Sequence, residues 1–262
     1  MPKFAIALLL ILSSLSLKAQ TWELGGAVGA SGYMGDLNPN NPLKFSGVAL
    51  SGFVQRNFNG YLSAKLNYTY GQIAGADSTS SNQQFRNRNL SFKTQLQELS
   101  LIGEFNFMEY IPDVSNNRFT PFIYLGIGIV NYNPQATYMG QTYNLRPLAT
   151  EGETPYGKTA IAIPYGAGIK YNISGKWNVN ADIGYRQPNT DYLDDVSGLY
   201  PDKSKLTSPI AVALSDRSGE KTGVYTGVAG TQRGDLRPHD TYLFLQVGVS
   251  YTFVTDKCYF SR

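Results

Sequence analysis

Four carboxylates and two tyrosines fall within one short stretch, NTDYLDDVSGLYPD, which runs from Asn189 to Asp202. The carboxylates are Asp191, Asp194, Asp195 and Asp202. Carboxylates at this density can bind a divalent metal ion, work as an acid–base pair, or accept hydrogen bonds from the backbone in tight turns. The choice among these depends on which structural element carries the stretch.

Other residue types that support catalysis or metal binding are scarce. The single histidine, His239, leaves little room for histidine-based metal sites or triads, and the sequence contains no Gly-x-Ser-x-Gly motif. The single cysteine, Cys258, excludes a disulfide within the chain and a multi-thiolate metal site. We therefore expect no cofactor, no metal site and no catalytic residue, and we do not expect an enzyme.

The first residues have the layout of a secretory signal peptide. Lys3 precedes an apolar run from Phe4 to Leu12, and small residues lead to Ala19. Because the run is too short to span a bilayer, we predict that residues 1–19 are a signal peptide. The formal net charge of +3 includes Lys3 and Lys18, which leaves +1 for the remainder. With no basic block, a nucleic-acid partner is not expected.

Beyond residue 19, apolar and polar residues alternate with the period of two that is typical of β-strands. The clearest case is the last segment, where every second position is apolar: Leu243, Leu245, Val247, Val249, Tyr251 and Phe253. Eight segments are predicted as strands: 22–33, 45–56, 62–70, 95–107, 119–132, 161–173, 177–186 and 243–253. Long connections at 34–44, 72–94, 133–160 and 187–240 alternate with shorter ones.

This pattern predicts an all-β protein, an eight-stranded antiparallel transmembrane β-barrel of the outer membrane over residues 20–254. Its long loops would face outward, and its short turns and both termini would face the periplasm. A soluble β-sandwich or lipocalin-like barrel has the same alternation but turns its apolar face inward.

Two features favour the membrane. Aromatic residues lie towards strand ends, as interfacial girdles require; they are Trp22, Tyr33, Tyr68, Tyr70, Tyr124, Tyr132, Tyr165, Tyr171, Trp177 and Tyr185. The last strand carries a pattern that resembles the signal read by the barrel assembly machinery: Gln246, Gly248, Tyr251 and Phe253. Outer-membrane lipids and this machinery are therefore expected partners.

Eight strands enclose a narrow lumen that side chains fill. The polar strand faces carry charges of both signs, which we expect to pair across the interior: Lys65, Glu98, Glu104, Lys170, Asp182 and Arg186. A passive pore is not expected. Function should therefore lie on the loops, on the periplasmic rim or on a partner.

The acidic stretch then falls in the longest outer loop, after the seventh strand. It lacks the calcium-loop pattern of alternating carboxylates followed by glycine. We predict that Asp191, Tyr192, Asp194 and Asp195 shape this loop or dock a partner. Ion binding and catalysis are the alternatives.

Residues 255–262 are predicted to form a periplasmic tail. An odd cysteine in an oxidising compartment is either inert or one half of an intermolecular disulfide. Because Cys258 lies beyond the last strand, we predict that the tail contacts a periplasmic partner, with or without a disulfide. The contact residues would be Lys257, Cys258, Tyr259 and Phe260, with the two aromatics as apolar anchors.

Several stretches resemble, in the same order, those of the PorG-type outer-membrane proteins of the type IX secretion and gliding machinery. They are YMGDLNP, RNLSF, NPQATYMGQTYNLRPLATEGE, IPYGAGIKY and TDYLDDVSGLYPD, and the similarity covers nearly all of the chain after the signal peptide. The resemblance implies a non-enzymatic barrel that anchors or organises a periplasmic ring of the lipoprotein PorK and its partner PorN. The alternative is an independent OmpA- or OmpX-like barrel whose loops bind surface ligands or carry a hydrolase site.

Overall fold

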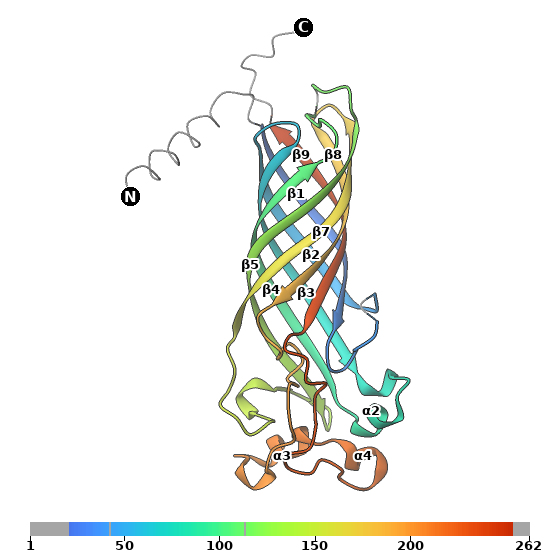
Figure 1. Ribbon diagram of the computed structural model, residues 1–262, viewed down its shortest axis with the longest axis vertical. Coiled ribbons are helices and arrows are strands. Elements are labelled where there is room, and N and C mark those ends of the chain that lie inside the picture. Colours follow the sequence, from blue (N-terminus) through green and yellow to red (C-terminus); the bar gives the residue numbers. More distant parts are fainter. Residues whose placement is uncertain (1–20, 42, 113, 254–262) are drawn as a thin grey trace, which may run out of the picture.

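Eight long antiparallel strands close into a barrel (Figure 1). A computed structural model of the chain describes residues 21–41, 43–112 and 114–253. The barrel strands are β1 (Thr21–Met34), β2 (Phe45–Asn57), β3 (Leu62–Ala76), β4 (Ser91–Asn106), β5 (Phe119–Tyr138), β7 (Thr159–Ser174), β8 (Trp177–Pro188) and β9 (Thr241–Phe253). Each pairs with its neighbour along the chain, and the pairing of β1 with β9 closes the ring. The predicted fold class is confirmed.

The short β6 (Gln141–Asn144) pairs only with the far end of β5 and lies outside the ring. Strands β3 and β4 remain paired as far as Ala76 and Ser91, beyond the predicted strand ends. Beyond Tyr70 the outward positions of β3 carry Gln72, Ala74 and Ala76, while Ile73 points inward. The apolar alternation weakens there, which is why the sequence pattern underestimates the strand length. The predicted signal peptide and the predicted tail, with Lys257, Cys258, Tyr259 and Phe260, lie outside the described residues.

The two ends of the barrel differ in construction (Figure 1). Short turns connect the strands at the end where β1 begins and β9 ends. The long connections gather at the other end and carry the helical turns: η1 (Asp77–Thr79), α2 (Gln83–Arg88), η2 (Arg146–Leu148), η3 (Lys203–Lys205), α3 (Pro209–Ser215) and α4 (Ser218–Thr222). We call the described residues of 35–44, 77–90, 145–158 and 189–240 the cap. In the described parts of the chain, no helix is both long and apolar enough to cross a membrane.

The apolar face of the strands points away from the barrel interior. Val28, Leu125 and Val247 lie in the middle of their strands and expose 61%, 62% and 55% of their surface. Exposed aromatics surround the short-turn end of this apolar band: Trp22, Phe105, Phe119, Tyr171, Trp177 and Phe253. An outward apolar band bordered by aromatic side chains is the surface of a membrane-spanning barrel, whereas a soluble barrel would turn these residues inward.

Three of the predicted girdle aromatics are placed differently. Tyr124 points into the lumen, where its hydroxyl donates to Asp182 Oδ2 at 3.2 Å. Tyr33 and Tyr132 are buried at the cap end. All three lie at inward positions of their strands, so nearness to a strand end did not decide which face the ring occupies.

Charged side chains fill the lumen and pair across it, as predicted. Glu104 accepts from Lys170 Nζ and lies 3.5 Å from Lys65 Nζ. Glu98 lies 3.4 Å from Arg186 Nε, and the Tyr242 hydroxyl donates to it at 2.8 Å. A cavity of about 20 Å³ remains among these side chains, which is room for about one water molecule.

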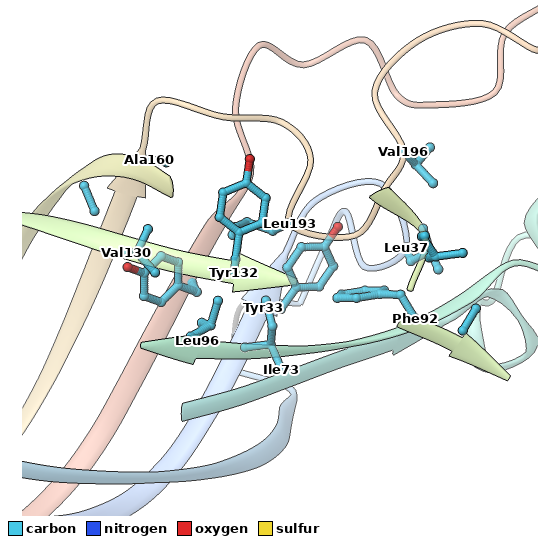
Figure 2. Close-up of a cluster of buried hydrophobic side chains, with 14 of the residues drawn as sticks. Tyr33, Leu37, Ile73, Phe92, Leu96, Val130, Tyr132, Ala160, Leu193 and Val196 are labelled. Carbon is cyan, nitrogen blue, oxygen red and sulfur yellow. The ribbon is translucent and has the colours of Figure 1, made fainter. Parts of the chain in front are cut away.

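The hydrophobic core lies where the barrel meets the cap. Figure 2 shows Tyr33 of β1 and Phe92 of β4 close together, with Leu193 and Val196 arriving from the cap above the strands. The Tyr33 and Phe92 rings meet edge to face, with centroids 4.8 Å apart. Tyr242 and Phe244 of β9 are buried in this core. The long loops therefore form a packed layer over the barrel end.

Candidate functional site in the cap

The structure divides the acidic stretch into a buried part and an exposed part. Asp191, Asp194 and Asp195 are all buried in the cap, whereas Asp202 is exposed. Leu193, between the buried carboxylates, has no exposed surface and packs into the core. Its carbonyl accepts from Thr94 Oγ1 of β4 at 2.6 Å. The stretch is thus pinned to the barrel wall by both apolar packing and a hydrogen bond.

Asp195 joins two loops through its carboxylate. One oxygen accepts from Thr150 Oγ1 and the other from the Tyr156 hydroxyl, each at 2.6 Å. Arg233 donates to the Asp195 carbonyl at 2.8 Å and pairs with Glu151 at 2.9 Å. Burial raises the pKa of the Asp195 carboxyl to about 6, although Arg233 and the two hydroxyls act in the opposite direction.

Tyr192 and Asp191 complete the segment. The Tyr192 ring is half-buried and stacks on Tyr156 with centroids 4.4 Å apart. Burial, with a contribution from nearby carboxylates such as Asp36, raises the pKa of the Asp191 carboxyl to about 7. Asp195 thus holds two loop segments together through its carboxylate. The predicted role of Asp191, Tyr192, Asp194 and Asp195, in loop shaping or docking, stays a prediction.

Asp194 belongs to a second, denser group. Two further carboxylates lie beside Asp194. Asp36 comes from the loop after β1, and Asp240 directly precedes β9. One oxygen from each of the three carboxylates lies within 4.8 Å of the other two. The Tyr33 hydroxyl lies among them, donating to Asp194 Oδ2 and lying 3.2 Å from Asp240 Oδ1. We call Asp36, Asp194 and Asp240 the acidic triad.

The triad carboxylates are oriented by the backbone. Val196 N–H donates to Asp194 Oδ1 at 2.9 Å, and Leu193 N–H donates to Asp240 Oδ2 at 2.9 Å. Asp235 N–H donates to Asp36 Oδ1. Each carboxylate therefore uses one oxygen to fix a loop. The second oxygens of Asp194 and Asp240 face the Tyr33 hydroxyl, whereas Asp36 Oδ2 has no hydrogen-bond partner. Burial raises the pKa of Asp36 to about 7 and raises the pKa values of Asp194 and Asp240 well above the usual range.

The nearest arginines are held by other groups. Arg88 makes a two-pronged pair with Asp77, at 2.8 and 2.7 Å, and donates to the main-chain carbonyls of Asp36 and Arg233. Arg233 is bound to Glu151 and to main-chain carbonyls. Among the ion pairs of the described residues, none involves a triad carboxylate.

Sequence reasoning singled out Asp194 but missed its companions. Asp36 lies inside the stretch YMGDLNP, which the resemblance had marked without assigning it a role, and Asp240 follows the lone histidine. Tyr33 was assigned to the membrane interface. His239 itself is exposed on the cap surface. The missing signal is the barrel closure, since only the pairing of β1 with β9 brings residues 33–36 beside residue 240.

A family model described as "Domain of unknown function (DUF6089)" matches residues 2–232. The chain belongs to the DUF6089 family. No curated protein matches this DUF6089 member.

Among solved structures, this DUF6089 protein is similar to Neisserial surface protein A, with 10% identity and a TM-score of 0.45 over 90% of this chain and 100% of that chain. It is also similar to a major outer membrane protein from Thermus thermophilus, with 13% identity and a TM-score of 0.41 over the same shares. A third is Ail of Yersinia pestis, with 12% identity and a TM-score of 0.40, again over 90% and 100%.

The last strand of the DUF6089 protein carries the four residues of the predicted assembly signal. Gln246 and Gly248 face the lumen, while Tyr251 and Phe253 face outward near the aromatic border. The Trp177 and Tyr251 rings meet edge to face at 5.1 Å. Recognition by the barrel assembly machinery stays a prediction.

Proposed function

We propose that this protein is a non-enzymatic outer-membrane component of a type IX protein secretion machine, where it anchors or organises a periplasmic ring of PorK- and PorN-type proteins. The observation that carries the proposal is the series of motifs that resembles PorG-type proteins, in the same order, from YMGDLNP to TDYLDDVSGLYPD. The first and the last of these motifs lie in the cap and at its junction with the strands, and they supply Tyr33, Asp36 and Asp194.

The filled lumen supports an anchoring role over a transport role. Ion pairs from Glu98 and Glu104 cross the interior, and the cap packs over the far end. A chain in transit would have to displace these pairs and expose buried charges, which is costly. What such a barrel offers a machine is its membrane anchorage, its rim and its surface.

In this proposal the tail makes the periplasmic contact through Lys257, Cys258, Tyr259 and Phe260. The test is purification from outer membranes in mild detergent, followed by identification of the proteins that accompany the barrel. We expect the ring proteins to accompany the wild-type protein and to be lost when residues 257–262 are deleted. A tail-deleted barrel that retains the complete ring would contradict the assignment of the contact, and a wild-type barrel that purifies alone would contradict the function.

The proposed orientation places the cap outside the cell and the short turns in the periplasm. In a Cys258→Ser background, Tyr225→Cys in the cap and Asn116→Cys in a short-turn connection provide matched, exposed labelling sites. A maleimide that cannot cross membranes should label Tyr225→Cys on whole cells and leave Asn116→Cys unlabelled. The reverse pattern would invert the proposed orientation.

The surface of the cap favours a second candidate, a barrel that binds surface ligands through its loops. Val224, Tyr225 and Val228 fall within five residues of one another shortly after α4 and are largely exposed. Exposed aromatic and aliphatic side chains close together are typical of binding surfaces. Replacing all three by Ser should leave secretion intact if the machine component is the correct proposal, and should abolish surface binding if the second candidate is correct.

A further inference from the structure

We propose that the acidic triad of Asp36, Asp194 and Asp240 is a calcium-binding site that fastens the cap to the barrel. The proposal rests on geometry in the cap and is independent of the proposed role in secretion. It concerns residues that the sequence pattern of calcium loops does not detect, because Asp36 comes from one connection of the barrel while Asp194 and Asp240 lie 46 residues apart in another.

An unpaired oxygen supplies the first line of support. Asp36 exposes 1% of its surface, and its Oδ2 atom is buried without a hydrogen-bond partner. Its other oxygen is already used by the Asp235 N–H group. A buried carboxylate oxygen without a donor is rare in folded proteins, because desolvating it is costly unless a donor or a cation compensates. A cation bound among the triad would provide that compensation.

The balance of charge supplies the second line of support for a bound cation. Three carboxylates with at most 1% of their surface exposed meet in one place, and the Tyr33 hydroxyl is a neutral donor. Asp191 and Asp235 add negative charge around them. Arg88, the nearest cation, has its side-chain donors on Asp77 and on main-chain carbonyls. Buried carboxylates in such proximity need protons or a cation between them.

The donor set selects the class of ion. All three ligands are carboxylate oxygens, which hard divalent cations prefer over the nitrogen and sulfur ligands of zinc or copper. Calcium binds oxygens at about 2.3–2.6 Å, so ligands on opposite sides of the ion lie about 5 Å apart, which matches the spread of the triad oxygens within 4.8 Å. Calcium also accepts irregular geometry, whereas magnesium requires a near-ideal octahedron and retains several waters. A buried set of ligands drawn from two loops therefore fits calcium better.

Gly35 lets two polar groups of the triad region lie directly against the backbone. A Cβ atom at this position would collide with Asp240 Oδ1 and with the Tyr33 hydroxyl. Its φ is not in the left-handed region, so the backbone alone does not require glycine here. The missing side chain is what lets the Asp240 carboxylate and the Tyr33 hydroxyl approach each other.

A bound ion would hold the cap against the end of the barrel. Asp36 follows β1, Asp240 precedes β9, and Asp194 lies in the cap segment pinned by Leu193. A single ion would therefore join the seam where the barrel closes to the segment that covers it. Releasing the ion should loosen the cap while leaving the ladder of the barrel intact.

The test is calorimetric titration of Ca²⁺ into the full-length barrel in detergent, after treatment with a chelator and its removal. We expect about one ion per chain for the wild type and for Asp202→Asn, an exposed carboxylate variant in the same loop. We expect binding weaker by about tenfold or more in Asp36→Asn, because the site loses charge while an amide oxygen can still accept from Asp235 N–H. Gly35→Ala should abolish binding, because the added methyl group would displace the Asp240 carboxylate.

The wild-type titration decides the outcome even if a variant fails to fold. A chelated wild-type barrel that takes up no Ca²⁺, or that takes up only Mg²⁺, overturns the proposal. So does equal Ca²⁺ binding by wild type, folded Asp36→Asn and folded Gly35→Ala, because the ion would then bind elsewhere. A wild-type barrel that binds Ca²⁺ normally but purifies without the ring proteins would contradict the proposed function and leave the calcium site standing.

Discussion

The lumen and the cap both bury carboxylates, and they differ in what lies opposite each charge. In the lumen, Glu104 lies against Lys65 and Lys170, and Glu98 lies against Arg186. In the cap, the triad carboxylates face one another and the Tyr33 hydroxyl. Each of these lumen carboxylates therefore has a cation of the chain opposite it, whereas among the described residues no ion pair reaches a triad carboxylate, and the proposed calcium ion would take that place. A buried carboxylate is an ion-pair partner in the lumen and a proposed calcium ligand in the cap.

The largest expected effect breaks the compensation in the lumen. Glu104→Gln leaves Lys65 and Lys170 buried without their carboxylate, and we expect it to destabilise the barrel by about 3–5 kcal/mol. The temperature at which the folded band converts to the unfolded band on a denaturing gel should fall. Glu109→Gln, an exposed carboxylate in a short-turn connection, is the control and should leave it unchanged. Equal conversion temperatures for both variants would show that the lumen pairs contribute little.

The next effect tests the outward apolar band of the barrel, which we expect to contact lipid. Val247→Arg places a charge within the outward apolar band and should cost about 2–4 kcal/mol, so less protein should reach the folded, heat-modifiable state. Asn180→Ser on the lumen side of the neighbouring strand should have a much smaller effect. If the arginine variant assembles as well as wild type, the band does not contact lipid.

A moderate effect is expected at Asp195, a buried carboxylate of the cap whose two oxygens both have hydrogen-bond donors within the chain. Tyr156→Phe removes one of the two hydroxyl donors to Asp195 and should destabilise the cap by about 1–2 kcal/mol. Limited proteolysis should then cut within residues 145–158 sooner than in wild type. Tyr225→Phe, an exposed tyrosine of the cap, should show wild-type cleavage. Unchanged cleavage in Tyr156→Phe would mean that Thr150 alone holds Asp195.

The smallest effect has the opposite sign and sharpens the comparison. With divalent cations removed, Asp194→Asn reduces repulsion within the triad and keeps an oxygen for the Val196 N–H group. We expect a small increase in cap stability by the same proteolysis assay in chelator, and a decrease in the presence of Ca²⁺. Destabilisation of equal size under both conditions would indicate a purely structural carboxylate.

The barrel was accessible to sequence reasoning because its rules are local. The alternation around Val247 fixes which face meets lipid, and the charges of Lys65 and Glu104 on the opposite face predict the filled lumen. Tyr124 shows the limit of such reasoning, since its place near a strand end suggested the interface while its inward parity placed it in the lumen. Parity along the strand is the stronger signal.

The triad was not accessible in the same way. Asp194 stood out because its neighbours are also acidic, but Asp36 and Asp240 are isolated carboxylates in different loops. They meet Asp194 only because β1 pairs with β9 and because Leu193 pulls the longest loop onto the barrel end. Long-range closure and loop packing leave no periodic pattern in the sequence, so a site assembled by them is found only in the structure.

The central claim is that the cap, unlike the lumen, relies on a bound cation. It is tested most directly by amide hydrogen exchange of the wild-type barrel in detergent, with Ca²⁺ and with chelator. The amides of Leu193, Val196 and Asp235, which donate to the triad carboxylates, should exchange faster in chelator, while those of β3 and β4 around Lys65 and Glu104 should not change. Identical exchange of the three cap amides under both conditions would contradict the claim.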